Sequence, residues 1–482
     1  MKSLDPTEKT TDPKEKTTRY VRRLIWLYFW LLVFEGALRK WVVPQYSNAL
    51  LIVRDPVLLA IYALAIKARL FPRHTWILSL AVMGVLSLGT TLVQLWPYLQ
   101  PYKIALVGGY GFRSNFLHLP LIFVIAAAMR FEDVRRIGWW TLLLMPPMAL
   151  LLVGQFNAAP DAFLNRTAGG EGEMMMAALG KVRTAGTFSF VIGVASFFAL
   201  ATAYLIYGAL KTGAYKTPLL IAAGSALVIG IAVSGSRTVV AACAVVVGSL
   251  AVVLFLQPRA VNRFGQALIA TLVMGLIVTK TPIFREGLNV LTTRFAEVAE
   301  QTEQSIARGM VVRVFETFGE GFFVYSKAPL LGYGLGIGTN AGARFLTGRS
   351  MFLLSEGEWS RIFLEMGPVL GPAYLFWRCA CVFYVGLLAL RALKIGNILP
   401  GLLFSACFLS MISGQFGQPT ILGFTVFVMG LALAATRGDQ SAAPVVSQPK
   451  SHGRSFRGRS VYSEALHGSR AANGQTNGAV DR

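Results

Sequence analysis

The chain has 482 residues, of which 55% are hydrophobic and 14% are charged, and its mean hydropathy is +0.57. A soluble chain must cover its core with polar surface, so this composition excludes an ordinary soluble protein and predicts a chain that lies mostly in lipid. The formal charge of +22, from 45 basic and 23 acidic residues, is spread in short clusters between apolar segments. That distribution argues against nucleic acid as a partner.

The apolar segments have the length that a helix needs to cross about 30 Å of hydrocarbon, and they lack the alternation of membrane strands. We therefore predict an all-α, polytopic integral membrane protein with about twelve transmembrane helices. The spans are expected at 24–43, 49–66, 76–96, 114–129, 137–156, 188–210, 218–234, 238–256, 264–279, 361–388, 398–413 and 420–436.

Lysine and arginine gather in alternate short loops, which predicts that these loops face the cytoplasm. The polar N-terminal tail, 1–23, and the C-terminal tail, 437–482, fall on the same side as these loops. Both termini are therefore expected in the cytoplasm, with a transmembrane domain over 24–436. The C-terminal tail is rich in Ser, Gly, Arg and Asn, and we expect it to be disordered.

The largest connection, 280–360, lies between the ninth and tenth predicted spans, on the side opposite the basic loops. Its apolar residues recur at helical spacing among charged ones, which predicts amphipathic helices on the membrane face or capping the bundle. They are Leu288, Leu291, Phe295, Val298, Val311, Val314, Phe315, Phe318 and Phe322.

Charged residues near the outer ends of the spans need partners or a function, because charge is costly inside a bilayer. For Arg54 and Asp55 we expect local pairing, and for Arg39 and Lys40 we expect side chains that extend toward the membrane surface. Arg237 follows a short Ser-Gly-Ser bend that leaves its guanidinium open to an anionic ligand.

The segment EGEWSR at 356–361 leads into the tenth span. Arg361 and Glu365 are four residues apart and Glu358 lies one turn earlier, so all three are expected on one helix face, either as structural ion pairs or as catalytic groups. The preceding run PLLGYGLG at 329–336 is rich in glycine, but it follows no strand and is expected outside the cell, so we reject a nucleotide loop.

The four cysteines lie inside predicted spans, and Cys379 and Cys381 form CxC rather than a metal-spaced pair. This pattern predicts neither a disulfide framework nor a zinc site. We expect no metal and no cofactor.

Three features in order along the chain resemble the O-antigen ligase and O-antigen polymerase superfamily of bacterial envelope enzymes. They are the Ser236-Arg237-Thr238 turn, the long outer loop with Arg313 upstream of PLLGYG, and the E-x-G-x-x-G stretch of Glu365, Gly367 and Gly371. The opening segments EGALRKW at 35–41 and RDP at 54–56 resemble exopolysaccharide polymerases within that group.

The resemblance implies a multi-pass protein of the bacterial inner membrane that takes glycan from a polyprenyl-diphosphate-linked oligosaccharide. Arg237 and Arg313, with Arg361, would bind the donor diphosphate, and we expect Arg237 and Arg313 within about 10 Å of each other. Polysaccharide export or chain-length proteins are further partners to expect, beside membrane lipid.

The chain departs from the family in one place. Ligases of this group carry a histidine in the large loop, where this chain has Glu356 and Glu358. Either a carboxylate replaces the imidazole as base, with Glu358 first and then Glu356 and Glu365, or the chain does not carry out ligase chemistry. His118 is the candidate base after these carboxylates. A carrier or flippase for the same lipid-linked glycan, and a membrane scaffold, are the alternatives.

Overall fold

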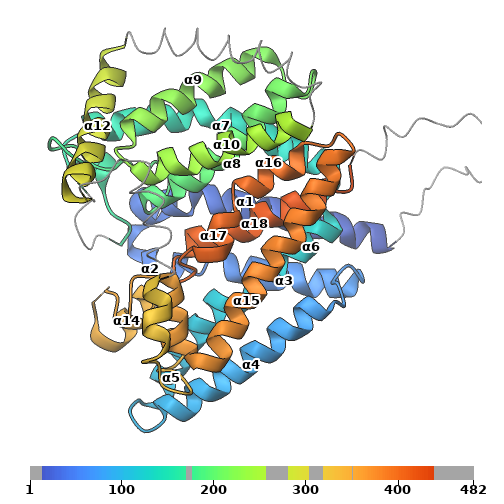
Figure 1. The fold of residues 1–482 in the computed structure, drawn as a ribbon, viewed down its shortest axis with the longest axis vertical. Helices are drawn as coiled ribbons and strands as arrows, with labels where there is room; N and C mark the ends of the chain where they lie inside the picture. Colours follow the sequence, from blue (N-terminus) through green and yellow to red (C-terminus); the bar gives the residue numbers. More distant parts are fainter. Residues whose placement is uncertain (1–12, 170–175, 257–280, 303–318, 350, 439–482) are drawn as a thin grey trace, which may run out of the picture. The chain divides into compact units, whose positions relative to one another are not determined.

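The computed structural model describes residues 13–169, 176–256, 281–302, 319–349 and 351–438, and Figure 1 shows their arrangement. The predicted ninth span, 264–279, both predicted tails for most of their length, and Arg313 lie outside the described residues. In the described part of the chain every regular element is a helix apart from an isolated bridge between Met176 and Val182. The all-α prediction is therefore confirmed.

The longer described helices are α1 Pro13–Ala37, α3 Arg54–Lys67, α4 Thr75–Leu95, α5 Pro101–Phe112, α7 Phe131–Asn157, α8 Val191–Leu210, α9 Thr217–Val233, α10 Arg237–Leu256, α12 Pro282–Thr302, α15 Glu358–Lys394 and α18 Pro419–Ala435. The shorter ones are α2 Ser47–Leu50, α6 Leu121–Ala128, α14 Asn340–Thr347, α16 Leu399–Ser405 and α17 Phe408–Ser413. Two π-helical turns, η1 Leu38–Val42 and η3 Arg113–Leu117, continue α1 and α5.

Seven helices of the described residues are long and apolar enough to cross a membrane, and α9 and α18 are shorter apolar helices. The chain is thus an all-helical protein with several helices suited to spanning a bilayer. Two boundaries differ from the prediction. A helix already begins at Pro101, ahead of the expected span at 114, and the expected span at 398–413 is broken between α16 and α17.

Four of the predicted basic loops and the start of the C-terminal tail lie together at one end of the described helices, which we call the basic end. Side-chain hydrogen bonds link Arg22 to the carbonyl of Ala128 and Arg437 to that of Met129. Further bonds link residue 215 to residue 135 and residue 397 to residue 435. The basic end therefore includes segments 19–23, 128–136, 211–216, 391–397 and 437, which the charge pattern predicts to share one side. The predicted basic loop with Arg259 and Arg263 lies outside the described residues.

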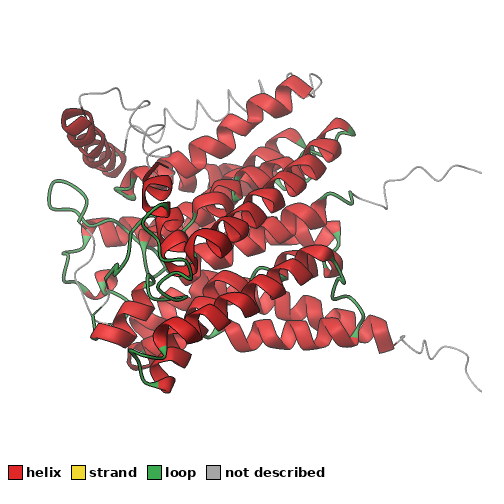
Figure 2. Cartoon of the chain, turned by 60° about the horizontal axis from the view of Figure 1, so that its bottom comes forward, coloured by secondary structure: helices red, strands yellow, loops and turns green. Residues whose placement is uncertain are grey.

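The longer connections lie at the other end, which we call the loop end (Figure 2). It consists of segments 35–55, 110–118, 184–189, 330–367 and 409–419, which hydrogen bonds join to one another. Helix α12 confirms the helical prediction for the first part of the large connection. It packs Val290 and Leu291 inward and leaves Leu288 exposed, while Gly287 approaches the backbone of Ala232 at the end of α9.

Helix α15 consists of two segments joined at Gly367, whose φ of 76° and ψ of 179° are not helical. The helical partner of the Leu364 carbonyl would be the N–H of residue 368, but Pro368 has none. The N–H of Tyr333 donates to that carbonyl instead, at 2.7 Å, and the N–H of Gly334 donates to the Glu365 carbonyl at 3.1 Å. The glycine-rich run therefore satisfies the backbone at the kink.

Glycine is required in this run because the backbones lie in direct contact. Gly332, Gly334 and Gly336 all have positive φ, and a Cβ on Gly332 or Gly336 would collide with the carbonyl of Glu365 or Val107. The run thus caps a broken helix. This structural role explains its glycines without nucleotide binding.

We expect Gly367→Ala to destabilise the protein by about 1–3 kcal/mol, because its φ and ψ are open to glycine almost alone and a Cβ there would collide with the Leu330 carbonyl. Unfolding in detergent, followed by temperature, measures the effect. Gly401→Ala in α16, where a Cβ meets nothing within 4 Å, is the matched control and should keep the midpoint or raise it slightly, because alanine favours a helix over glycine. Equal midpoints for the two variants would contradict this account of the kink.

Candidate functional site

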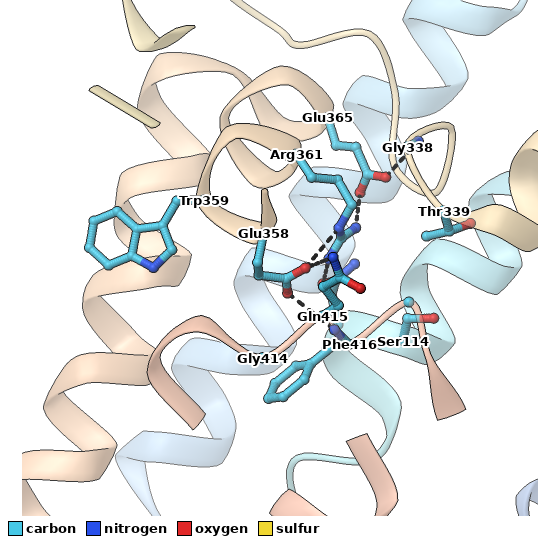
Figure 3. Close-up of polar contacts among 12 residues, drawn as sticks. Ser114, Gly338, Thr339, Glu358, Trp359, Arg361, Glu365, Gly414, Gln415 and Phe416 are labelled. Atoms are coloured by element: carbon cyan, nitrogen blue, oxygen red, sulfur yellow. Dashed lines mark hydrogen bonds and ion pairs between the residues drawn. The ribbon is translucent and has the colours of Figure 1, made fainter. Parts of the chain in front are cut away.

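The first segment of α15 carries a buried charged group on one face (Figure 3). Arg361 Nε donates to Glu358 Oε2 at 2.9 Å, and Arg361 Nη1 donates to Glu365 Oε2 at 2.7 Å. All three residues are 4% exposed or less. The predicted shared face and its ion pairs are therefore confirmed, but they form in the interior of the protein, not at an exposed surface.

Arg378 completes this group, although it lies 20 residues after Glu358. Its Nη1 donates to Glu358 Oε1 at 2.7 Å, and its other nitrogens donate to the carbonyls of Met411, Ser410 and Gly414. In a straight helix the two residues would be about 30 Å apart, so the bond requires the first segment to fold back sharply at Gly367. The sequence analysis missed Arg378, and its signal was a lone arginine inside an apolar span.

A polar residue of η3 joins the same group from another part of the chain. Arg361 Nη2 donates to Asn115 Oδ1 at 3.1 Å, and the Tyr374 hydroxyl donates to the Asn115 carbonyl at 3.0 Å. The second Glu365 oxygen, Oε1, accepts the N–H of Gly338 at 2.9 Å. Arg361 thus uses Nε, Nη1 and Nη2 on protein partners. π-helical turns of this kind often mark functional sites.

A second buried group lies one turn away on η3. Arg113 Nε donates to Asp55 Oδ2 at 2.5 Å, and His118 Nε2 shares a hydrogen bond of 3.0 Å with Asp55 Oδ1. The other ring nitrogen of His118 shares a bond of 3.1 Å with the Tyr28 hydroxyl. The expected local pair of Arg54 and Asp55 is therefore wrong, because each pairs with a different helix.

The third group holds the residues expected to reach the membrane surface. Arg54 Nε donates to Glu35 Oε2 at 2.8 Å, and Arg39 lies 3.7 Å from the other Glu35 oxygen. Arg39 also donates to Ser47 and Ser189, and Lys40 Nζ donates to the carbonyl of residue 186 at 2.5 Å. The predicted extension of Arg39 and Lys40 toward the surface is wrong, since both are buried.

The three groups together are richer in cations than in carboxylates. Among the described residues their cations are Arg39, Lys40, Arg54, Arg113, Arg361 and Arg378, and their carboxylates are Glu35, Asp55, Glu358 and Glu365. The cations of these three groups therefore outnumber their carboxylates, in or near the interior. Such a surplus attracts anions.

A polar hollow adjoins the first group. Its volume is about 10 Å³, room for about one water molecule, and Arg361 and Glu356 line it. The remaining lining residues are Gly338, Thr339, Asn340, Phe352, Gln415, Gly417 and Gln418. The Asn340 Oδ1 is buried and has no partner in the described part of the chain. Glu358 does not line the hollow, because both of its oxygens face protein donors.

Arg237, the other described arginine predicted to bind the diphosphate, contacts helix α12. It begins α10, and its Nη1 donates to the carbonyl of Arg294 on α12 at 3.3 Å. The predicted approach of Arg237 to Arg313 concerns a residue outside the described ranges. In those ranges no cluster of three or more His, Cys, Asp or Glu side chains could hold a metal ion.

Comparison with models of known protein families gives no match for this chain, and comparison with curated proteins gives none. The resemblance to the O-antigen ligase and polymerase superfamily therefore rests on the motifs quoted above and on the arrangement of the predicted spans.

Proposed function

We propose that the chain is a polysaccharide polymerase or ligase, which transfers glycan from a polyprenyl-diphosphate-linked oligosaccharide at the outer face of the bacterial inner membrane. The observation that carries the proposal is the buried charged network at the loop end, in which cations outnumber carboxylates. Ionisable groups inside a membrane protein are costly and are kept for function, and a diphosphate is an anion that would balance this surplus.

The proposal places about twelve spans in the membrane, both termini in the cytoplasm and the connection 280–360 in the periplasm. Its support is the gathering of the basic loops at one end, together with the bias of lysine and arginine toward cytoplasmic loops. The charged network then faces the periplasm, where a glycan is transferred without a nucleotide sugar. Export or chain-length proteins would act beside it.

In the proposed reaction the acceptor hydroxyl oxygen bonds to the anomeric carbon of the donor, and the bond from that carbon to the diphosphate breaks. The electron pair leaves with the diphosphate, which Arg237 and Arg313 hold together with Arg361. The acceptor proton passes to a carboxylate. The sequence favours Glu358 for that step, but both of its oxygens accept bonds from protein donors. We therefore assign the step to Glu356, which is exposed and lines the hollow beside Arg361, while Glu358 and Glu365 position Arg361.

The test is the surface glycan of a strain that lacks this protein, complemented with the wild type or with Glu356→Gln. We expect the deletion to lose long glycan chains and to accumulate lipid-linked repeats on the outer leaflet. Glu356→Gln should reduce long chains by about a hundredfold or more, since general base catalysis contributes that much. Gel separation of the glycan and mass spectrometry of the lipid-linked repeats are the measurements.

Glu286→Gln is the matched control, because Glu286 is a half-exposed carboxylate of α12 that pairs with Lys181. It should leave chain length unchanged. Repeats that accumulate on the inner leaflet would instead identify a carrier or flippase. If the strain with Glu356→Gln makes glycan chains of normal length, Glu356 is not the base. Glu358, Glu365 and His118 would then be tested in that order.

A further inference from the structure

A second and larger hollow lies at the basic end. Its volume is about 430 Å³, and it is formed by the first turns of α7 and the connection before α9. Arg135 and Tyr215 fix its wall: the Tyr215 hydroxyl donates to the Arg135 carbonyl at 3.0 Å, and Arg135 Nη2 donates to the Ala214 carbonyl at 3.3 Å. The hollow is therefore held in shape by bonds between two segments.

The hollow is lined by two cations and one carboxylate. Arg135 and Arg136 contribute guanidinium groups, and Glu132 contributes its carboxylate. The Nε of Arg135 is buried with no partner among the described residues, and Arg136 is exposed. One positive charge is left over, and guanidinium groups suit the oxygens of a phosphate.

Aromatic side chains form the other wall. Trp139 and Trp140 meet edge to face at 4.9 Å, and Trp140 meets Trp30 of α1 in the same way at 5.1 Å. Tryptophan is enriched where a membrane protein meets the headgroup region of the bilayer. This wall thus fits the boundary between polar headgroups and acyl chains.

The exposed face of α7 continues from the hollow along the helix. Arg136 is followed on this face by Trp139, Leu143 and Leu150, which are 39%, 38% and 74% exposed. Their spacing of three, four and seven residues places them in one stripe. Along the stripe a cation is followed by an aromatic residue of the interfacial kind and then by leucines. This order matches a phospholipid, whose anionic headgroup is followed by the interfacial region and the acyl chains.

We propose that this hollow binds the phosphate headgroup of an anionic phospholipid, with its acyl chains along the exposed stripe of α7. The proposal is independent of glycan transfer. A free phosphate would satisfy the two arginines, but it would leave the tryptophans and the apolar stripe without a role. Basic pockets beside membrane helices are suited to anionic headgroups.

Native mass spectrometry of the full chain, purified in detergent and titrated with phosphatidylglycerol or phosphatidylcholine, tests the proposal. We expect phosphatidylglycerol to bind preferentially, and Arg136→Gln to weaken that binding by about fivefold, since one basic residue near an anionic membrane contributes about 1 kcal/mol. Arg136 is exposed, so the variant should fold. Trp139→Ala should also weaken the binding of phosphatidylglycerol.

Lys394→Gln is the matched control, an exposed basic residue at the same end that does not line the hollow. It should leave phosphatidylglycerol binding unchanged. An equal loss for Lys394→Gln would mean unspecific surface attraction and would overturn the site. Displacement of the lipid by inorganic phosphate at equal concentration would overturn the lipid as occupant, as would unchanged binding in Trp139→Ala.

Discussion

Arg378→Ala is expected to lower the free energy of unfolding by about 3–5 kcal/mol, because removing one partner of a buried ion pair leaves an uncompensated charge. Arg378 is fully buried, binds Glu358 at 2.7 Å and donates to three carbonyls of the segment 410–414. Its guanidinium also lies 3.8 Å from the ring centre of Phe416. Denaturation in mixed micelles measures the loss.

Two further variants separate charge from packing. Glu358→Gln in the Arg378→Ala background removes the stranded charge, so we expect the double variant to be more stable than Arg378→Ala alone. Arg391→Ala, at the exposed end of the same helix, should stay close to the wild type. If Arg378→Ala unfolds no more easily than Arg391→Ala, the sharp fold of α15 at Gly367 is not held by this pair.

Arg361→Gln is expected to abolish glycan transfer and also to destabilise the chain. Glu365 would keep its hydrogen bond from the Gly338 N–H but lose its bond of 2.7 Å from the Arg361 guanidinium. The buried Glu365 carboxylate would then have no counter-charge. The double variant Arg361→Gln/Glu365→Gln removes both charges. We therefore expect it to recover folded protein while transfer stays about a hundredfold or more below the wild type.

Comparing the two variants distinguishes a role in the reaction from a role in folding. The amount of monodisperse protein after purification reports folding, and surface glycan length in the complemented strain reports transfer. If the double variant recovers glycan transfer together with folded protein, Arg361 has a structural role only. Glu286→Gln is again the neutral control for the charge change.

Local features of the charged site were predictable because they depend on spacing within a few residues. The separation of Glu358, Arg361 and Glu365 predicts one helix face, and the structure has their ion pairs on it. The prediction failed for Arg54 and Asp55, which are adjacent in sequence but point to different helices. Their partners, Glu35 and Arg113, lie 19 and 58 residues away.

The helical fold, the suitability of several helices for a membrane and the common side of the basic loops could all be predicted from the sequence alone. Those properties follow from apolar length and from the position of charges along the chain. Which charged groups pair with one another depends on how the helices pack. Arg361 donates a hydrogen bond to Asn115, which lies 246 residues earlier in the chain. Arg378 pairs with Glu358 because the helix is broken at Gly367. A buried charge is tolerated only where neighbouring helices supply partners for it. The spacing of residues within one helix does not reveal how that helix packs against the others.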